Sequence, residues 1–158
     1  MRHTRTHPRT LGYLGRALSL EYSAVQQYMT QANLCDAWGL SEAAQRFRAE
    51  TVEELQHAER IVKRMLGLGF APNGSRLQPA AMARDLVGLL QQDAVLEAKI
   101  VALYEEAAEF CRRIRDHESA AFFDALWREE KHHKEEIQAW LVELGARQPE
   151  DGNQRVYF

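Results

Sequence analysis

Apolar residues recur at intervals of three and four along four long stretches of this chain, and that spacing marks one face of an α-helix. The stretches cover about residues 9–36, 41–67, 82–114 and 119–144. Gly39 ends the first stretch, and Ser41 stands where an N-cap would open the second. No run has the alternating pattern and hairpin turns of β-strands. The sequence therefore predicts an all-α fold with four helices.

Two of the connections between these stretches are short, and one is long. Residues 115–118 form a brief polar break, whereas residues 69–81 contain Pro72, Asn73, Gly74 and Pro79, which disfavour regular structure. Short connections join antiparallel neighbours, and a long connection permits a crossover. We therefore expect a four-helix bundle built from two antiparallel hairpins that a long crossover joins.

The two ends of the chain lack the pattern of the bundle. Residues 1–8 are basic, and residues 145–158 are polar with Gly145, Pro149 and Gly152 among them. A chain of 158 residues, 46% of them apolar, has enough buried surface for one core. We expect an N-terminal arm over residues 1–8, the bundle over residues 9–144 and a C-terminal tail over residues 145–158 with little packed structure.

The charge and the cysteines narrow the choice of partners and compartment. The 23 acidic and 20 basic residues give a net charge of -3, so no basic excess favours nucleic acid. No apolar run reaches the length that spans a bilayer, and no signal-peptide core follows the basic N-terminus. We expect a cytoplasmic protein without a nucleic-acid or membrane partner. Cys35 and Cys111 lie alone in helical patterns, which favours buried free thiols.

Two glutamates interrupt the apolar faces of the predicted helices. Glu21 follows Leu14 and Leu18 on the first face, and Glu97 lies between Leu90 and Tyr104 on the third. An unpaired carboxylate that is buried in the core destabilises the folded protein by roughly several kcal/mol. Something must therefore compensate the charge of these side chains.

The second and fourth helices each supply a Glu-x-x-His sequence. These are Glu54 with His57 and Glu130 with His133. At this spacing both side chains point from one helical face and can bind one ion together. Glu21 and Glu54 are 33 residues apart, and so are Glu97 and Glu130. The two hairpins therefore form an internal repeat.

One Glu from each of two helices with Glu-x-x-His from the other two is the ligand set of di-iron and di-manganese carboxylate bundles. In this arrangement Glu54 and Glu130 bridge two ions. Carboxylate and imidazole ligands suit iron or manganese better than metals that prefer thiolate. The sequence predicts two metal ions per chain, one completed by Glu21 and His57 and the other by Glu97 and His133.

The fourth helix offers a second register, Glu129 with His132. We favour Glu130 and His133, because only they keep the repeat and because Leu126, Ile137, Leu141 and Leu144 share their face. His132 is then a surface residue near the site. A single Glu-x-x-His is common by chance on exposed helices, but two copies with two repeat-related glutamates favour a metal site. We interpret Tyr28 and Trp38 as core aromatics.

Beyond these ligand positions, three short segments give the chain a resemblance to bacterioferritin over about residues 10–145. They are Gln27-Tyr28, the turn at residues 37–40, and residues 57–60 with the sequence His-Ala-Glu-Arg. The resemblance implies a ferritin-like bundle, with Glu21, Glu54, His57, Glu97, Glu130 and His133 as ferroxidase ligands for two iron ions. It also implies homodimers that assemble into a cage, which stores iron after Fe(II) is oxidised by dioxygen or hydrogen peroxide.

The sequence departs from the bacterioferritin pattern at several positions. Leu55 replaces the methionine that binds haem between paired subunits, so we predict that haem is absent. Ala49 and Glu53 stand where some relatives have the His and Asp of an accessory iron site, and Ile61 replaces a tyrosine. Pro149 and the glycines of the tail replace a short fifth helix that closes contacts in the cage.

The sequence favours a ferroxidase and iron-storage protein over two alternatives. One is a di-metal peroxidase or oxygenase on the same bundle, and the other is a structural or accessory ferritin-like subunit. Apolar residues outside the predicted core, such as Leu20, Leu34 and Val62, favour an antiparallel homodimer. The sequence leaves open the oxidant, the choice of iron or manganese, the formation of a full cage and co-assembly with another ferritin subunit.

Overall fold

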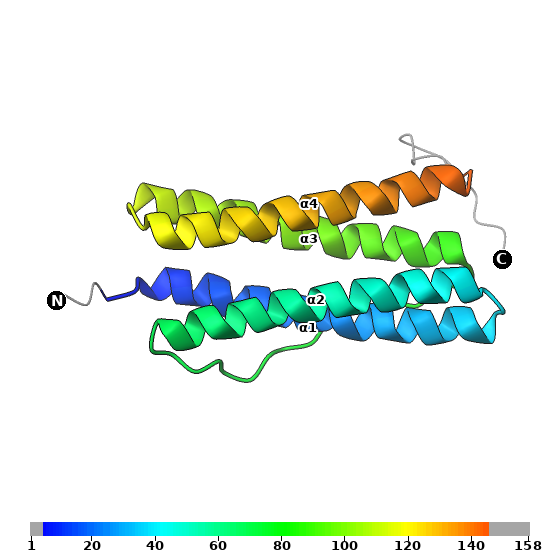
Figure 1. Cartoon of the computed structure of the whole chain (residues 1–158), viewed down its shortest axis with the longest axis horizontal. Helices are drawn as coiled ribbons and strands as arrows, with labels where there is room; N and C mark the ends of the chain where they lie inside the picture. The colour runs from blue at the N-terminus through cyan, green and yellow to red at the C-terminus, as the bar shows by residue number, and fades with distance from the viewer. Residues whose placement is uncertain (1–4, 146–158) are drawn as a thin grey trace.

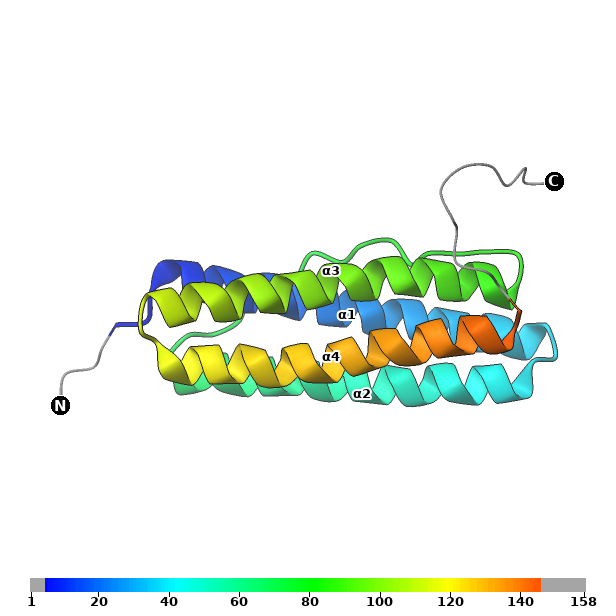
Figure 2. The same cartoon turned by 90° about the horizontal axis from the view of Figure 1, so that it is seen from above.

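The computed structural model describes residues 5–145, which form a bundle of four helices: α1 (Pro8–Ala37), α2 (Ser41–Gly67), α3 (Leu86–Arg113) and α4 (His117–Glu143). Helices α1 and α2 form one antiparallel hairpin, and α3 and α4 form the other (Figure 1). Helix α1 also packs against α3, and Figure 2 shows the two hairpins stacked along their whole length. The predicted all-α four-helix bundle is confirmed.

The predicted starts of the third and fourth helices were wrong by four and two residues, and the N-cap role predicted for Ser41 was wrong. Ser41 is the first residue of α2, and its N-cap is Leu40, which makes no side-chain cap. Helix α3 begins at Leu86, because the Asp85 carboxylate accepts a hydrogen bond from Gly88 N at 2.7 Å. Helix α4 begins at His117 after Asp116, whose carboxylate accepts from Ser119 N at 3.1 Å. Apolar periodicity cannot locate such caps, because capping side chains lie outside the apolar face.

The core lies between the four helices and contains large aromatic and aliphatic side chains. Tyr28 is fully buried, Trp38 is half-buried, and Cys35 and Cys111 are buried free thiols, as expected. Val25 is only half-buried, and Leu144 is exposed, so the apolar faces are narrower than the sequence pattern indicates. The fully buried members include Tyr13, Leu14, Phe47, Leu89, Ile100, Phe123 and Leu126.

The crossover between the hairpins is held against α1 by polar side chains at every fourth position. Ser19 Oγ and Ser23 Oγ accept hydrogen bonds from the backbone N–H groups of Arg76 and Gln78, at 3.1 and 3.0 Å. The Gln27 side chain accepts from Ala81 N at 3.2 Å, and Gln31 donates to the Ala81 carbonyl at 3.4 Å. These bonds satisfy backbone groups of a segment that has no secondary structure of its own.

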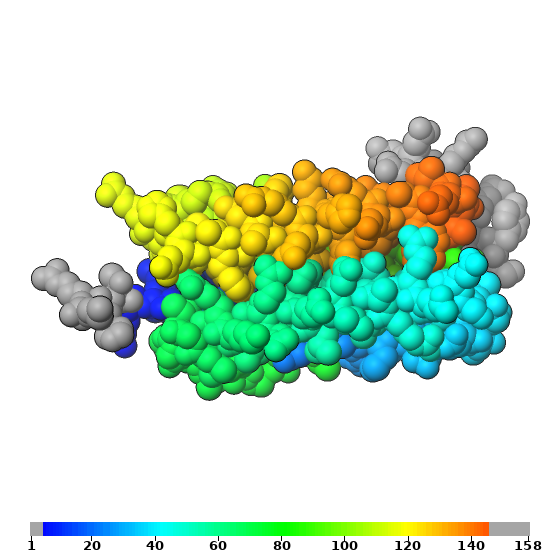
Figure 3. Space-filling model, viewed as in Figure 1, coloured from blue at the N-terminus to red at the C-terminus, as the bar shows by residue number. Residues whose placement is uncertain are grey.

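Helices α2 and α4 meet in a seam along one face of the bundle, which Figure 3 shows in space-filling form.

Among residues 5–145, no helix has both the length and the apolar character to cross a bilayer. Residues 146–158 of the tail, for which we expected little packed structure in place of a fifth helix, lie outside the described residues, as do residues 1–4 of the N-terminal arm.

Candidate metal centre

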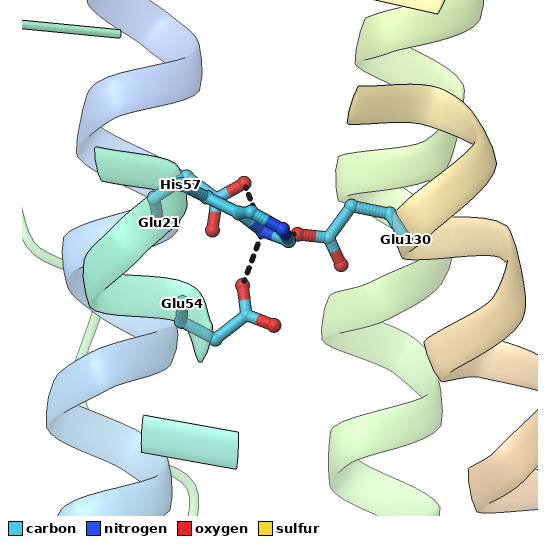
Figure 4. A group of neighbouring side chains, drawn as sticks. All are labelled: Glu21, Glu54, His57 and Glu130. Atoms are coloured by element: carbon cyan, nitrogen blue, oxygen red, sulfur yellow. Dashed lines mark hydrogen bonds and ion pairs between the residues drawn. The ribbon is translucent and has the colours of Figure 1, made fainter. Parts of the chain in front are cut away.

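The six predicted ligands project into the middle of the bundle from all four helices. Glu21 comes from α1 and Glu97 from α3, while α2 and α4 each contribute their Glu-x-x-His pair. Figure 4 shows Glu21, Glu54, His57 and Glu130 pointing toward one another. All six side chains are buried: Glu21, Glu54, His57, Glu97, Glu130 and His133.

The six residues form two overlapping groups. Glu21 and His57 belong to one group, Glu97 and His133 belong to the other, and Glu54 and Glu130 belong to both. Within each group, the ligand atoms offered by the four residues all lie within 4.8 Å of one another. Such spacing fits one ion in each group, with Glu54 and Glu130 available to both ions.

Each histidine reaches the shared glutamate of the opposite hairpin. His57 Nδ1 lies 2.8 Å from Glu130 Oε1, and His133 Nδ1 lies 2.7 Å from Glu54 Oε1. Each Nδ1 atom lies 3.7 Å from the glutamate of its own Glu-x-x-His pair. The Nδ1 atoms therefore face the centre, and the Nε2 atoms face outward.

Two tyrosines hold the glutamates that belong to only one group. Tyr28 donates its hydroxyl hydrogen to Glu97 Oε1, and Tyr104 donates to Glu21 Oε1, both at 2.6 Å. Tyr28 is thus a core aromatic that also contacts a candidate ligand. Each tyrosine follows the glutamate of its own helix by seven residues, so the two tyrosines occupy equivalent positions of the internal repeat. This equivalence is the sequence signal that could have identified them. The sequence pattern places them on the buried face but does not reveal their partners across the bundle.

Several buried polar atoms of the centre have no hydrogen-bond partner. His133 Nδ1 and Glu54 Oε1 are close, but they are not aligned for a hydrogen bond. Unsatisfied buried oxygens of this kind are costly, and cations would satisfy them. The residues therefore fit a pair of divalent ions. The unpartnered atoms are Glu21 Oε2, both Oε atoms of Glu54, Glu97 Oε2, Glu130 Oε2 and His133 Nδ1.

Burial and mutual repulsion change the proton affinities of these carboxylates. Burial, with the charges of Glu21 and Glu97, raises the pKa of Glu54 to about 8. Burial, with the charges of Glu21 and Glu54, raises the pKa of Glu130 to about 8. Burial and the charge of Glu130 raise the pKa of Glu97 well above its usual range. Without metal, these three carboxyl groups therefore hold protons more tightly than exposed carboxyl groups do.

Hydrogen bonds act in the opposite direction to burial at Glu21 and the histidines. Burial would raise the pKa of Glu21, but the neighbouring Glu54 carboxyl group and His57 imidazole lower it to about 2. Burial would lower the pKa of His57, but the hydrogen bond with Glu130 and the nearby Glu21 carboxylate raise it to about 12. The carboxylates around His133 likewise raise its pKa against the effect of burial. Divalent ions must displace these protons when they bind.

The alternative register of α4 lies at the surface. Glu129 is half exposed and pairs with Arg60 Nη1 at 2.5 Å. His132 is mostly exposed and pairs with Glu136 at 3.2 Å. Neither residue belongs to the two groups that contain Glu54 and Glu130.

A second buried polar cluster lies one helical turn from Glu97. The Asp93 carboxylate accepts a hydrogen bond from Gln27 Nε2 at 2.7 Å, and its other oxygen has no partner. Burial raises the pKa of Asp93 to about 7, although the hydrogen bond from Gln27 and the nearby Gln31 amide oppose this. Asp93 precedes Glu97 by four residues and so lies on the same face of α3, but this spacing does not indicate its partners.

Comparisons with known proteins agree with this geometry. Residues 11–146 match the family described as Ferritin-like domain. The chain is 30% identical to a bacterioferritin of Brucella melitensis over 134 residues, which cover 85% of this chain and 83% of the relative. It is 32% identical to a bacterioferritin of Rhodobacter capsulatus over 125 residues, covering 79% and 78% of the two chains. The chain therefore belongs to the ferritin-like family, and bacterioferritins are among its relatives.

Proposed function

We propose that this protein is a ferroxidase and iron-storage protein, which oxidises Fe(II) at a di-iron centre and deposits Fe(III) inside a protein cage. The observation that carries this proposal is the pair of buried ligand groups that share Glu54 and Glu130 inside a ferritin-like bundle. The membership of the chain in this family and its bacterioferritin relatives support the same activity.

The roles of the residues follow from their positions and charges. Glu54 and Glu130 would be shared by the two iron ions, Glu21 and His57 would complete one site, and Glu97 and His133 would complete the other. Four carboxylates balance the charge of two Fe(II) ions, and they favour the higher charge of Fe(III). Two Fe(II) ions supply two electrons, which reduce one hydrogen peroxide to two hydroxide ions or one dioxygen to the level of peroxide.

The protein contributes orientation and proton release to this reaction. Tyr28 and Tyr104 donate to Glu97 and Glu21, so each of these carboxylates keeps its other oxygen for iron. The protons that the centre retains without metal leave when iron binds. Iron uptake is therefore expected to release protons and to weaken as the pH falls.

Anaerobic titration with Fe(II), followed by addition of oxidant, tests the proposal. We expect two iron ions per chain and a rapid oxidation phase. The paired substitution Glu54→Ala with His57→Ala should abolish both. The matched control is His132→Ala with Glu136→Ala, which removes an exposed pair of the same residue types on α4 and should keep both. Binding of far fewer than two iron ions, or slow oxidation only, would refute the proposal.

The same experiment separates the alternatives. A structural or accessory subunit would keep its role after Glu54 and His57 are replaced. A peroxidase or oxygenase would turn over an organic substrate or peroxide without consuming free Fe(II) in proportion.

We further propose that the protein is a cytoplasmic homodimer that assembles into a cage. We also propose that it binds no haem at Leu55, because leucine lacks the sulfur that would bind haem iron.

A further inference from the structure

The two halves of the centre are equivalent in their ligands. Glu21 and Glu97 are 76 positions apart, and the same interval relates His57 to His133. It also relates Glu54 to Glu130 and Tyr28 to Tyr104. Any difference between the two ion sites must therefore come from side chains outside the ligand set.

Two carboxylates surround the outer nitrogen of His133. His133 Nε2 forms a hydrogen bond of 2.5 Å with Glu53 Oε2. It also lies within ion-pair distance of Glu50 Oε2, an oxygen that has no hydrogen-bond partner. The Glu50 side chain is 22% exposed and the Glu53 side chain 56% exposed, so both reach the surface beside a buried imidazole. Within residues 5–145, neither glutamate forms an ion pair with a lysine or an arginine. The outer surroundings of His133 therefore carry two negative charges.

The outer nitrogen of His57 has different surroundings. His57 Nε2 lies 3.9 Å from Glu129 Oε2, and that carboxylate pairs with Arg60. The charges of Glu129 and Arg60 cancel. The repeat explains the difference, because Glu53 corresponds to Glu129 but Glu50 corresponds to the buried Leu126.

We propose that the half containing Glu97 and His133 binds its divalent ion first, and that Glu50 and Glu53 give it this precedence. The inference rests on the proposed di-iron centre. A carboxylate that accepts a hydrogen bond from the outer N–H of an imidazole makes the other nitrogen a better metal ligand. Uncompensated negative charge beside the site attracts a cation in addition. Glu50 and Glu53 are thus positioning residues, which act on the metal through His133.

Anaerobic titration of the metal-free protein with Co(II), followed by visible absorption and calorimetry, tests this order. We expect two binding steps in the wild type, the first at least about tenfold tighter. Glu97→Gln should remove the tight step. Glu21→Gln, the repeat-related control, should keep the tight step and weaken the other. The opposite pattern, or two equal steps in the wild type, would overturn the inference.

The role of the outer carboxylates is tested with a substitution that the repeat itself suggests. Glu50→Leu introduces the residue found at the equivalent position, and it should weaken the tight step about tenfold or more. Glu50→Gln keeps the size of the side chain and should act in the same direction if the leucine variant does not fold. Glu129→Leu, on the other half, should leave the tight step unchanged.

The outcomes distinguish this inference from the proposed function. Two equal steps would overturn the order of binding and leave the di-iron centre intact. Failure of the wild type to bind two Co(II) ions would overturn the proposed centre and the inference together. A third bound ion that Glu50→Leu removes would also overturn the inference, because Glu50 would then be a ligand.

Discussion

At the residue scale, the hydroxyl groups of Tyr28 and Tyr104 offer a direct test of ligand orientation. Each donates to a candidate ligand at 2.6 Å. Burial raises the pKa of both tyrosines well above the usual range, so both remain donors at any working pH. Tyr28→Phe and Tyr104→Phe should each weaken metal binding about tenfold or more, as loss of an outer hydrogen bond does at other metal sites.

Calorimetry with Co(II) measures this effect. Tyr28→Phe should weaken the step that involves Glu97, and Tyr104→Phe should weaken the step that involves Glu21. Tyr13→Phe serves as a control, because its hydroxyl donates to Glu106, which is not a candidate ligand. Unchanged affinities in both test variants would show that the tyrosines act only as packing residues.

Asp93 should make the stability of the metal-free protein depend on pH. Its pKa is about 7 in the folded protein and near 3.8 in the unfolded chain. Between these values the folded state binds more protons, so the contribution of Asp93 to stability decreases as the pH rises from about 4 to 7. Asparagine does not titrate, so Asp93→Asn should lose no stability in this way. Its free energy of unfolding should rise relative to that of the wild type between these pH values, by roughly 4 kcal/mol at most.

Differential scanning calorimetry at several pH values checks this prediction. The Tm difference between Asp93→Asn and the wild type should grow between pH 4.5 and 7 and then level off. A difference that stays constant over this range would contradict it.

Because Leu55 stands at the position of the haem-binding methionine, we predict that the protein binds no haem. The Leu55 side chain is 52% exposed on α2, where a contact between subunits would cover it. Leucine has no sulfur for haem iron, so the wild type should show no haem spectrum after incubation with haem. Leu55→Met is the informative comparison, because it supplies the missing thioether. Haem bound at about one per two wild-type chains would refute the prediction.

At the element scale, the crossover depends on the polar positions of α1. Ser23→Ala removes the acceptor of Gln78 N–H and should destabilise the protein by about 1 kcal/mol. Thr30→Ala is the matched control. Thr30 Oγ1 donates to Gln26 O much as Ser23 Oγ donates to Ser19 O, but among the described contacts it has no crossover partner. Thermal unfolding of both variants measures the difference, and equal Tm changes would contradict the role of Ser23.

The sequence predicts some elements of this fold better than others, for physical reasons. Periodicity and the 33-residue intervals predicted four helices and the six residues that the structure brings together, because both signals are local or repeated. The partners of Tyr28, Asp93 and Ser23 were not predictable, since they depend on which residues lie opposite across the bundle. The starts of α3 and α4 were missed because an aspartate cap leaves no mark on the apolar pattern.

At the scale of the whole molecule, α1 and α2 leave apolar side chains uncovered. Met29, Val52, Leu55 and Leu66 are each more than half exposed. Leu20, Leu34 and Val62, which we expected in a subunit contact, are partly buried against the core of their own chain. These residues favour a contact between two chains through α1 and α2.

Light scattering measures the assembly. The wild type should form a dimer or a larger species, and Val52→Asp should reduce its size, because an isologous contact would bury the new charge twice. Val95→Asp is the control, since Val95 is equally exposed but lies on α3. A monomeric wild type would contradict the proposed assembly, and a dimer that retains no iron mineral would leave oxidation without storage.

The 76-residue repeat has a consequence for how such a centre can diversify. Two identical hairpins associating about a two-fold axis would each present the same three ligands and one tyrosine. Symmetry would then force their two ions to be equivalent. The crossover makes both hairpins parts of one polypeptide, so a single mutation reaches only one half. Glu50 opposite Leu126, and Asp93 opposite Ala17, are differences of this kind. Covalent linkage thus allows one ion to be acquired and handled differently from its neighbour.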